Sequence, residues 1–425
     1  MVMNVSVLKT PMLKIIHNRY FYTILSGIVI FLVAFFVLPH YLPATFAVDK
    51  DNEVGSTTSN IASSTVIEPP VIKKIIKHQK TPEAVKAIYM TACVAGTPSF
   101  RAKLLKLANE TEINSIIIDI KDYTGTVSFP IDDPEFESNI GTGCRVRDMA
   151  DFIETLHENN IYVIGRVTAF QDPQMTKVHP DWAVKKLSDK NVVWKDRKGL
   201  SFVDAGSKPM WQYLVNLSKA SYEIGFDEIN FDYIRFPSDG DMKDIYFPYS
   251  NDILINNIAR SAVGTSTLAV KSGKSIVLLS FFEFLNQSFK DTGIITSADL
   301  FGMTATNYDD LNIGQVLEDA LMNFDYVAPM VYPSHYPTGF NGYKDVNAHP
   351  YDIVKLSMDV ASKRATAIGI SPLKIRPWLQ DNDYPVPYTP AMVRAQIQAT
   401  YDAGLTSWML WDAGNTYTQS ALLAQ

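Results

Sequence analysis

Cysteine is scarce in this chain: among its 425 residues only Cys93 and Cys144 occur, and they form no CxxC pair. So few cysteines argue against a disulfide-rich scaffold and a structural zinc site, although the sequence leaves open one bridge between the two. Basic residues are also outnumbered by acidic ones: the chain has 38 Lys and Arg and 45 Asp and Glu, so its formal net charge is -7. Nucleic acid requires a basic surface, so we expect no nucleic-acid partner.

The short motifs of several common chemistries are absent as well. No HExxH zinc motif, GxSxG nucleophile elbow or Walker A phosphate loop occurs, and the histidines are scattered along the chain. A divalent ion held by Asp119, Asp122 and Asp232 is an alternative, but their spacing does not predict such a site. We therefore predict neither a metal nor a cofactor.

One long apolar run stands out near the N-terminus. Residues 20–38 read YFYTILSGIVIFLVAFFVL and carry no charge. As a helix, an apolar run of this length can span a bilayer core of ~30 Å. Basic residues within 1–19 precede the run, and a positive flank stays in the cytoplasm. We predict a single-pass transmembrane anchor over 20–38, with the bulk of the protein outside the cytoplasm. The alternatives are a buried core helix or a signal peptide cleaved after Thr45-Phe46-Ala47, which would release a secreted protein.

A flexible linker is predicted to follow the anchor, over residues 39–85. The stretch GSTTSNIASSTVIEPP within it has no apolar period and cannot bury a core, so it is typical of a tether. The folded unit is then expected over 86–425.

Short apolar runs alternate with longer helical patterns throughout 86–425. This alternation predicts a parallel sheet, and eight such units predict a (β/α)8 TIM barrel. The run 275–289 is read as an amphipathic helix rather than a ninth strand, because its apolar residues follow helical spacing. A doubly wound sheet is the alternative fold, although no Gly-rich loop follows the first strand. The predicted strands are 87–91, 115–120, 161–167, 226–234, 295–303, 324–332, 375–379 and 406–411, and the predicted enlarged loops are 131–145, 171–204 and 333–352.

Two carboxylates lie within apolar strands, where a charge is costly unless it is paired or functional. Asp232 lies in INFDYIRF and Asp299 in ITSADLFG. Strand alternation places Asp232 on the opposite face from Phe231 and Tyr233. A buried ion pair between Asp232 and Arg235 is the structural interpretation of this pattern, and a carboxylate at the bottom of a polar cleft is the functional one.

In TIM barrels the chemistry lies at the C-terminal ends of the strands. Two carboxylates across a cleft suit glycosidic bond cleavage, in which one stabilises or attacks the sugar carbon and the other protonates the leaving oxygen. We predict Asp232 and Asp299 as the catalytic pair. The predicted substrate-binding residues lie near the strand ends and stack on or hydrogen-bond to sugars; they are Asp119, Arg166, Asn230, Arg235, Tyr332, His335, Tyr336, Trp378, Gln380, Trp411 and Asp412.

Seven motifs carry a family resemblance that runs from about Ala87 to Asn415. They are GRVTAFQDP, FDEINFDYIRFP, SADLFGM, IGQVLEDA, DYVAPMVYPSHY, RPWLQD and SWMLWDAGN. Together they resemble the putative glycosyl hydrolase domain family of bacterial membrane-anchored proteins. The resemblance implies a barrel related to glycoside hydrolases, and it also favours a helix over 275–289.

Residue roles follow from the same resemblance. In relatives of the α-amylase type, the nucleophile ends the fourth strand and the acid ends the fifth, which implies Asp232 as nucleophile and Asp299 as acid/base. Arg235, Asp119 and Tyr332 would support them. Asp299 lies four residues before the predicted strand end at Met303 and would then point below the cleft. Asp309 and Asp381 are therefore alternative acids.

Two functional hypotheses result. The first is a membrane-anchored, extracytoplasmic glycoside hydrolase whose substrate is a cell-wall or surface polysaccharide or oligosaccharide. The second is a non-catalytic glycan-binding barrel that anchors or scaffolds at the cell envelope. The acidic composition favours neutral or cationic glycans over strongly anionic ones.

Overall fold

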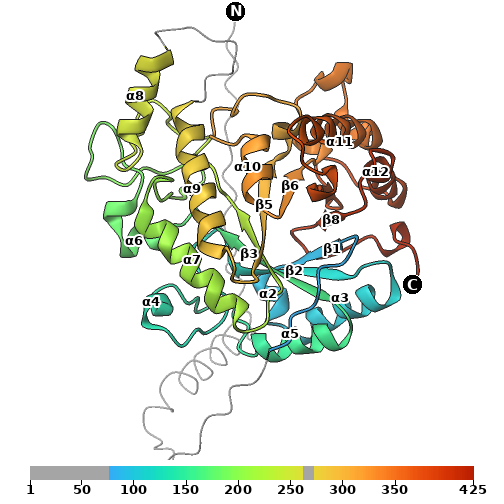
Figure 1. Cartoon of the computed structure of the whole chain (residues 1–425). Coiled ribbons are helices and arrows are strands. Elements are labelled where there is room, and N and C mark those ends of the chain that lie inside the picture. The colour runs from blue at the N-terminus through green and yellow to red at the C-terminus, as the bar shows by residue number, and fades with distance from the viewer. Residues whose placement is uncertain (1–75, 262–271) are drawn as a thin grey trace, which may run out of the picture. The chain divides into compact units, whose positions relative to one another are not determined.

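Eight parallel strands form a closed barrel in the computed structural model, which describes residues 76–261 and 272–425 (Figure 1). Each strand pairs with the next along the chain, and β8 pairs with β1 to close the ring. The structure confirms the predicted TIM barrel, and each strand overlaps its predicted segment. The strands are β1 Lys86–Met90, β2 Ser115–Lys121, β3 Tyr162–Thr168, β4 Glu228–Asp232, β5 Ile295–Phe301, β6 Tyr326–Met330, β7 Trp378–Gln380 and β8 Trp408–Trp411.

Strand alternation divides the apolar side chains into two layers. Along β1, Ala87 and Tyr89 belong to a small buried cluster that includes Ile117. Ile88 and Met90 belong to a larger buried cluster that also contains the apolar faces of the helices. The small cluster therefore fills the barrel, and the large one lies between the strands and the outer helices, as expected for this fold.

Helices follow the strands and cover the outside of the barrel (Figure 1). The segment 275–289 is helical, as predicted: it belongs to α9, which packs beside α7 and α8. Asn160, Gly225 and Gly404, which lie in the turns before β3, β4 and β8, all have positive φ. The helices are α2 Ala92–Ala95, α3 Pro98–Glu110, α4 Pro134–Glu137, α5 Met149–Glu158, α6 Met175–Val178, α7 Lys208–Tyr222, α8 Asn251–Ser261, α9 Gly273–Phe289, α10 Leu317–Asn323, α11 Pro350–Ala367 and α12 Pro390–Asp402.

The predicted membrane anchor, residues 20–38, lies outside the described residues. Within 76–261 and 272–425, none of the helices combines the length and the apolarity that crossing a bilayer requires.

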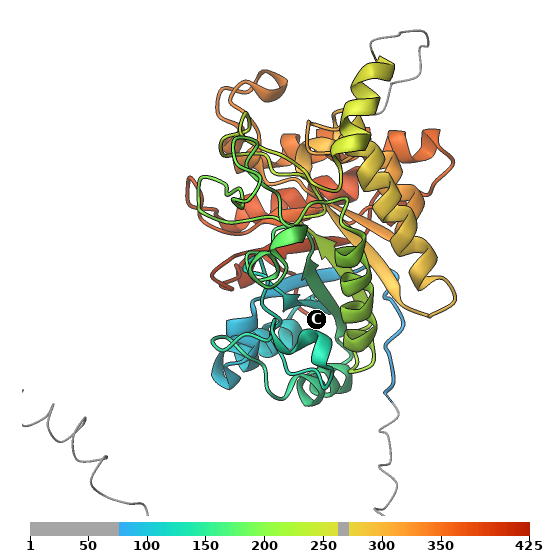
Figure 2. The same cartoon turned by 90° about the vertical axis from the view of Figure 1, so that its left-hand side faces the viewer.

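Long loops extend the barrel at the C-terminal ends of β3 and β4 (Figure 2). The loop after β3, within the predicted insertion 171–204, pairs with the loop after β4. Lys185 donates its backbone N–H to Tyr246 over 2.9 Å, and Tyr246 donates in return over 2.8 Å. These paired loops build up one side of the barrel mouth.

The two cysteines form a disulfide, the bridge that the sequence left open. Cys93 lies in α2, directly after β1, and Cys144 lies in the predicted insertion 131–145 before α5, with 4.4 Å between the two Cα atoms. The bridge therefore ties the enlarged loop after β2 to the loop after β1.

The last residues of the predicted linker contact the base of the barrel. The buried Asp227 carboxylate accepts hydrogen bonds from Gln79 N (2.6 Å) and Val163 N (2.8 Å), and it pairs with His157 Nε2 (2.9 Å). Val85 is fully buried, and its N–H donates to Ser407 Oγ. His78 also stacks on Tyr222 of α7, with 3.8 Å between ring centroids, so the described part of 39–85 packs against the folded domain.

Candidate active site

A cavity of about 260 Å³ opens at the C-terminal end of the barrel. Both predicted catalytic carboxylates, Asp232 and Asp299, line it. Six predicted substrate-binding residues line it with them: Arg166, Arg235, Tyr332, His335, Trp378 and Trp411. The structure therefore brings most of the predicted site residues into one cavity, although they come from different strands.

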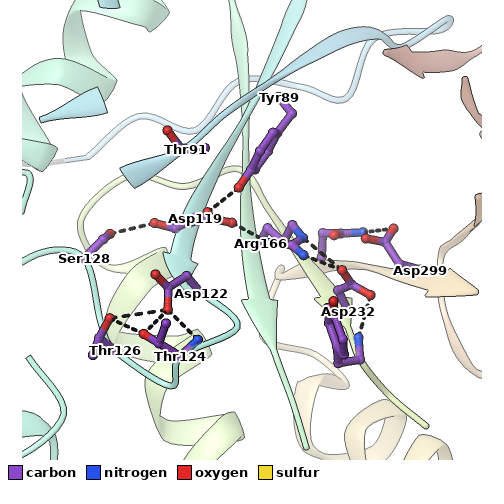
Figure 3. Close-up of polar contacts among 12 residues, drawn as sticks. Tyr89, Thr91, Asp119, Asp122, Thr124, Thr126, Ser128, Arg166, Asp232 and Asp299 are labelled. Atoms are coloured by element: carbon purple, nitrogen blue, oxygen red, sulfur yellow. Dashed lines mark hydrogen bonds and ion pairs between the residues drawn. The ribbon is translucent and has the colours of Figure 1, made fainter. Parts of the chain in front are cut away.

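Asp232, the last residue of β4, is held by the buried guanidinium of Arg166 on β3 (Figure 3). Arg166 Nη2 and Nε both donate to Asp232 Oδ2, over 2.5 and 3.1 Å, and Tyr233 N donates to the other carboxylate oxygen. The predicted alternative of a buried ion pair between Asp232 and Arg235 is wrong. The register of neighbouring strands sets Thr168 opposite Asp232, so Arg166, two residues earlier, reaches across.

Asp119 on β2 is the second partner of Arg166 and lies beneath the cavity. Arg166 Nη1 donates to Asp119 Oδ1 over 2.7 Å, so one guanidinium joins two buried carboxylates. Tyr89 OH donates to the other oxygen of Asp119 over 2.5 Å, and its ring stacks on Trp411 with 4.4 Å between centroids. Tyr89 was not among the predicted site residues. Its alternation with Ala87 in the first strand was the signal that it points into the barrel.

Asp299 on β5 has a different environment from Asp232. It is buried, and its Oδ1 accepts hydrogen bonds from Asn230 Nδ2 (2.9 Å) and Trp378 Nε1 (2.8 Å). Burial, helped by the negative charge of Asp232, raises the pKa of Asp299 to about 8. Asp299 is therefore protonated at neutral pH, while Asp232 faces a permanent positive charge. Two carboxyl groups whose environments differ in this way are suited to separate roles as acid and as nucleophile.

The expectation that Asp299 points below the cleft is wrong, because β5 ends at Phe301 rather than at Met303 and Asp299 lines the cavity. Neither alternative acid is among the residues that line it. Asp309 is exposed and accepts from Leu311 N in its own loop, and Asp381 accepts from Thr418.

Tyr233 lines the cavity next to Asp232, although alternation placed the two on opposite faces. Its φ of 51° is left-handed, a conformation that is rare outside glycine. This turn ends the strand pattern, so that Tyr233 and Arg235 face the cavity and Ile234 enters the apolar core. The other lining residues that sequence reasoning missed are Phe301, Gln315 and Met330.

Five predicted substrate-binding residues are not among those that line the cavity. Asp119 binds Arg166 and Asn230 binds Asp299, whereas the other three bond elsewhere. Tyr336 is buried, and its hydroxyl bonds to Ser357. The Gln380 amide donates to the Asn382 and Tyr384 carbonyls, and Asp412 accepts from Gly414 N. All three organise loops at the strand ends. All three lie near strand ends, as predicted, but the conformation around each residue directs its side chain away from the cavity.

The carboxylates of the alternative metal site are held apart. Asp122 Oδ1 accepts from the N–H and the hydroxyl of Thr124 in a local turn, whereas Asp119 and Asp232 bind Arg166 (Figure 3). In the part of the chain that the structure describes, no group of three or more His, Cys, Asp or Glu side chains is arranged to hold a metal ion.

Replacing Arg166 with methionine is expected to lower the free energy of unfolding by about 3–5 kcal/mol, because two buried carboxylates lose their countercharge. Urea unfolding at pH 7 measures the loss. The matched control is Arg235→Met in the same cavity, where no ion pair is broken and a loss of about 1 kcal/mol is expected. Equal losses in the two variants would contradict the bridging role of Arg166.

Sequence comparison identifies the family. A family model described as "Putative glycosyl hydrolase domain" matches residues 87–417. The chain belongs to this family. The match confirms the resemblance carried by the seven motifs, and the family points to a glycoside hydrolase. No sequence among the curated proteins matches the chain.

Solved structures share the barrel. The glycoside hydrolase domain of PgaB (BpsB) from Bordetella bronchiseptica is 13% identical, with a TM-score of 0.57, and the match covers 78% of this chain and 95% of that one. Alpha-L-fucosidase isoenzyme 2 from Paenibacillus thiaminolyticus is 11% identical, with a TM-score of 0.51, and the match covers 80% of this chain and 47% of the fucosidase chain. A hypothetical protein from Ruminiclostridium thermocellum is 29% identical over 50% of this chain and 96% of its own, with a TM-score of 0.40. At these identities, the first two similarities establish the fold alone.

Proposed function

We propose that this protein is a glycoside hydrolase that cleaves a cell-wall or surface polysaccharide outside the cytoplasm, with Asp232 and Asp299 as its catalytic pair. The observation that carries the proposal is one cavity that holds both carboxyl groups in different surroundings. Asp232 is paired with Arg166, and Asp299 is buried with its pKa raised to about 8. This combination is the one that two-carboxylate hydrolysis of a glycosidic bond requires.

The proposed reaction has two steps. Asp232 attacks the anomeric carbon while the bond to the leaving oxygen breaks, and the proton of Asp299 passes to that oxygen. Water then attacks the same carbon, Asp299 takes a proton from the water, and the bond to Asp232 breaks. Hydrogen bonds to both oxygens of Asp232 hold the carboxylate in one orientation before substrate binds.

Aromatic side chains in the cavity support a carbohydrate substrate. Trp378 and Trp411 lie at 87° to each other with 5.8 Å between ring centroids, and Tyr332 lines the same cavity. Trp378 also donates to Asp299. The same residue is therefore proposed to contact the sugar and to orient the acid.

An extracytoplasmic location is supported by two independent features of the chain. The apolar segment 20–38 has basic residues on its N-terminal side. The second feature is the Cys93–Cys144 disulfide. Disulfides are typical of proteins in oxidising compartments, because cytosolic thiols are kept reduced.

The proposed activity is tested with the full-length chain in detergent and a panel of bacterial wall and exopolysaccharide preparations. We expect new reducing ends from at least one glycan, and their formation is measured over time. Tight retention of a glycan without release of reducing ends would contradict the hydrolase and favour the glycan-binding barrel.

A further inference from the structure

Arg235 lines the cavity without a carboxylate partner among the described residues. Its Nη1 donates to the Phe236 carbonyl over 3.1 Å and to Ser238 Oγ over 3.3 Å. Its guanidinium carbon lies 5.2 Å from the ring centroid of Tyr233 and 6.0 Å from that of Phe202. The guanidinium is thus positioned by neutral groups, and its charge is not neutralised by them.

The other charged groups of the cavity leave this positive charge unmatched. The charge of Arg166 is paired with the carboxylates of Asp119 and Asp232. Asp299 is protonated at neutral pH, since its pKa is about 8. Burial lowers the pKa of His335, so its ring is neutral at the same pH. Among the residues that line the described cavity, Arg235 therefore presents the cation that is free for a ligand.

We propose that the substrate is an acidic glycan and that Arg235 binds an oxyanion substituent, such as a ring carboxylate, on a sugar within the cavity. This inference rests on the proposed hydrolase, because it assumes that the glycan occupies the cavity between Asp232 and Asp299. A guanidinium offers a planar pair of donors that matches the two oxygens of a carboxylate, whereas a neutral hydroxyl leaves its charge unpaired.

The negative net charge of the chain predicted a preference for neutral or cationic glycans. Charge spread over the whole surface acts at long range and is screened beyond ~8 Å in physiological salt. A sugar in the cavity meets Arg235 at contact distance instead. The local cation, rather than the overall charge, is therefore expected to decide the preference.

The test compares a uronic-acid polysaccharide with the same polymer after its carboxylates have been reduced to alcohols. Binding is measured by affinity electrophoresis in physiological salt with the full-length Asp232→Asn variant, so that no substrate is consumed. We expect the acidic polymer to bind about tenfold more tightly than the reduced one, as one charge-assisted contact provides. A sulfated glycan and its desulfated form serve as a second pair, which distinguishes a carboxylate from a sulfate substituent.

Arg235→Gln, added to Asp232→Asn, is expected to bring the binding ratio close to one. Arg235→Lys, which keeps the charge without the planar donor pair, is expected to retain part of the preference. The matched control is Arg197→Gln, which removes the same charge from an exposed loop residue and is expected to keep the full ratio. Circular dichroism confirms that each variant is folded.

Equal binding of the acidic and the neutral member of both pairs would overturn the inference. So would a preference that survives Arg235→Gln. Preference for an acidic polymer without release of reducing ends by the unmodified protein would instead overturn the proposed hydrolase and keep the acidic-glycan site.

Discussion

Replacing Asp232 with asparagine is expected to lower kcat for glycan hydrolysis by roughly 10⁴-fold or more, the scale of losing a central catalytic group. Asparagine retains an oxygen that accepts from Arg166, so the cavity keeps its shape, but its amide does not attack the anomeric carbon. Release of reducing ends measures the loss, and circular dichroism confirms the fold. The control is Asp309→Asn, an exposed carboxylate outside the cavity, for which full activity is expected.

Azide separates a nucleophile from a residue that only shapes the cavity. In Asp232→Ala the space left by the carboxylate admits azide, which attacks the anomeric carbon while the leaving oxygen takes the proton of Asp299. The expected product is a glycosyl azide whose anomeric configuration is opposite to that of the normal product. Full hydrolysis by Asp232→Asn, or an equal loss in Asp309→Asn, would remove Asp232 from the mechanism.

Replacing Asp299 with asparagine is expected to lower kcat on polysaccharide by about 10²–10⁴-fold, the usual contribution of a general acid. The acid must carry its proton to act, and the pKa of Asp299 is raised to about 8. The rate of the unmodified protein should therefore be sustained below about pH 8 and fall above it. In Asp299→Asn this alkaline decline is expected to disappear, because no proton is lost from the amide.

The matched comparison for Asp299→Asn is between two substrates that differ in their leaving group. An aryl glycoside with an acidic phenol needs little protonation, so this variant is expected to regain most of its rate on that substrate, whereas Asp232→Asn is not. A similar loss on the aryl glycoside and the polysaccharide would contradict the role of Asp299 as acid.

Stability gives a second measurement on Asp299 that does not depend on activity. Its folded pKa of about 8 lies above the usual value of 3.8, so the folded state binds more protons between these two values. The stability contributed by this group is complete below 3.8 and is lost as pH rises through about 8. Urea unfolding across this window should show a steeper decline for the unmodified protein than for Asp299→Asn.

The local sequence pattern was enough to predict the barrel and the strands on which Asp232 and Asp299 lie. Apolar β-branched runs separated by helical patterns specify parallel strands, because each run has two buried faces and each helix has one. The segment 275–289 was correctly predicted to be helical from its spacing, and the family resemblance favoured the same assignment. Asp232 and Asp299 were found because charges are rare in such strands.

Only the tertiary structure decided which groups meet in the cavity. Asp232 pairs with Arg166 rather than Arg235, because the register between β3 and β4 sets Thr168 opposite Asp232 and so brings Arg166 within reach. The sequence by itself thus determined the fold and the strands that carry the two candidate carboxylates. The direction of each side chain near a strand end depends also on contacts between segments far apart in the sequence, such as the hydrogen bond from Ser334 N to Gln380 Oε1.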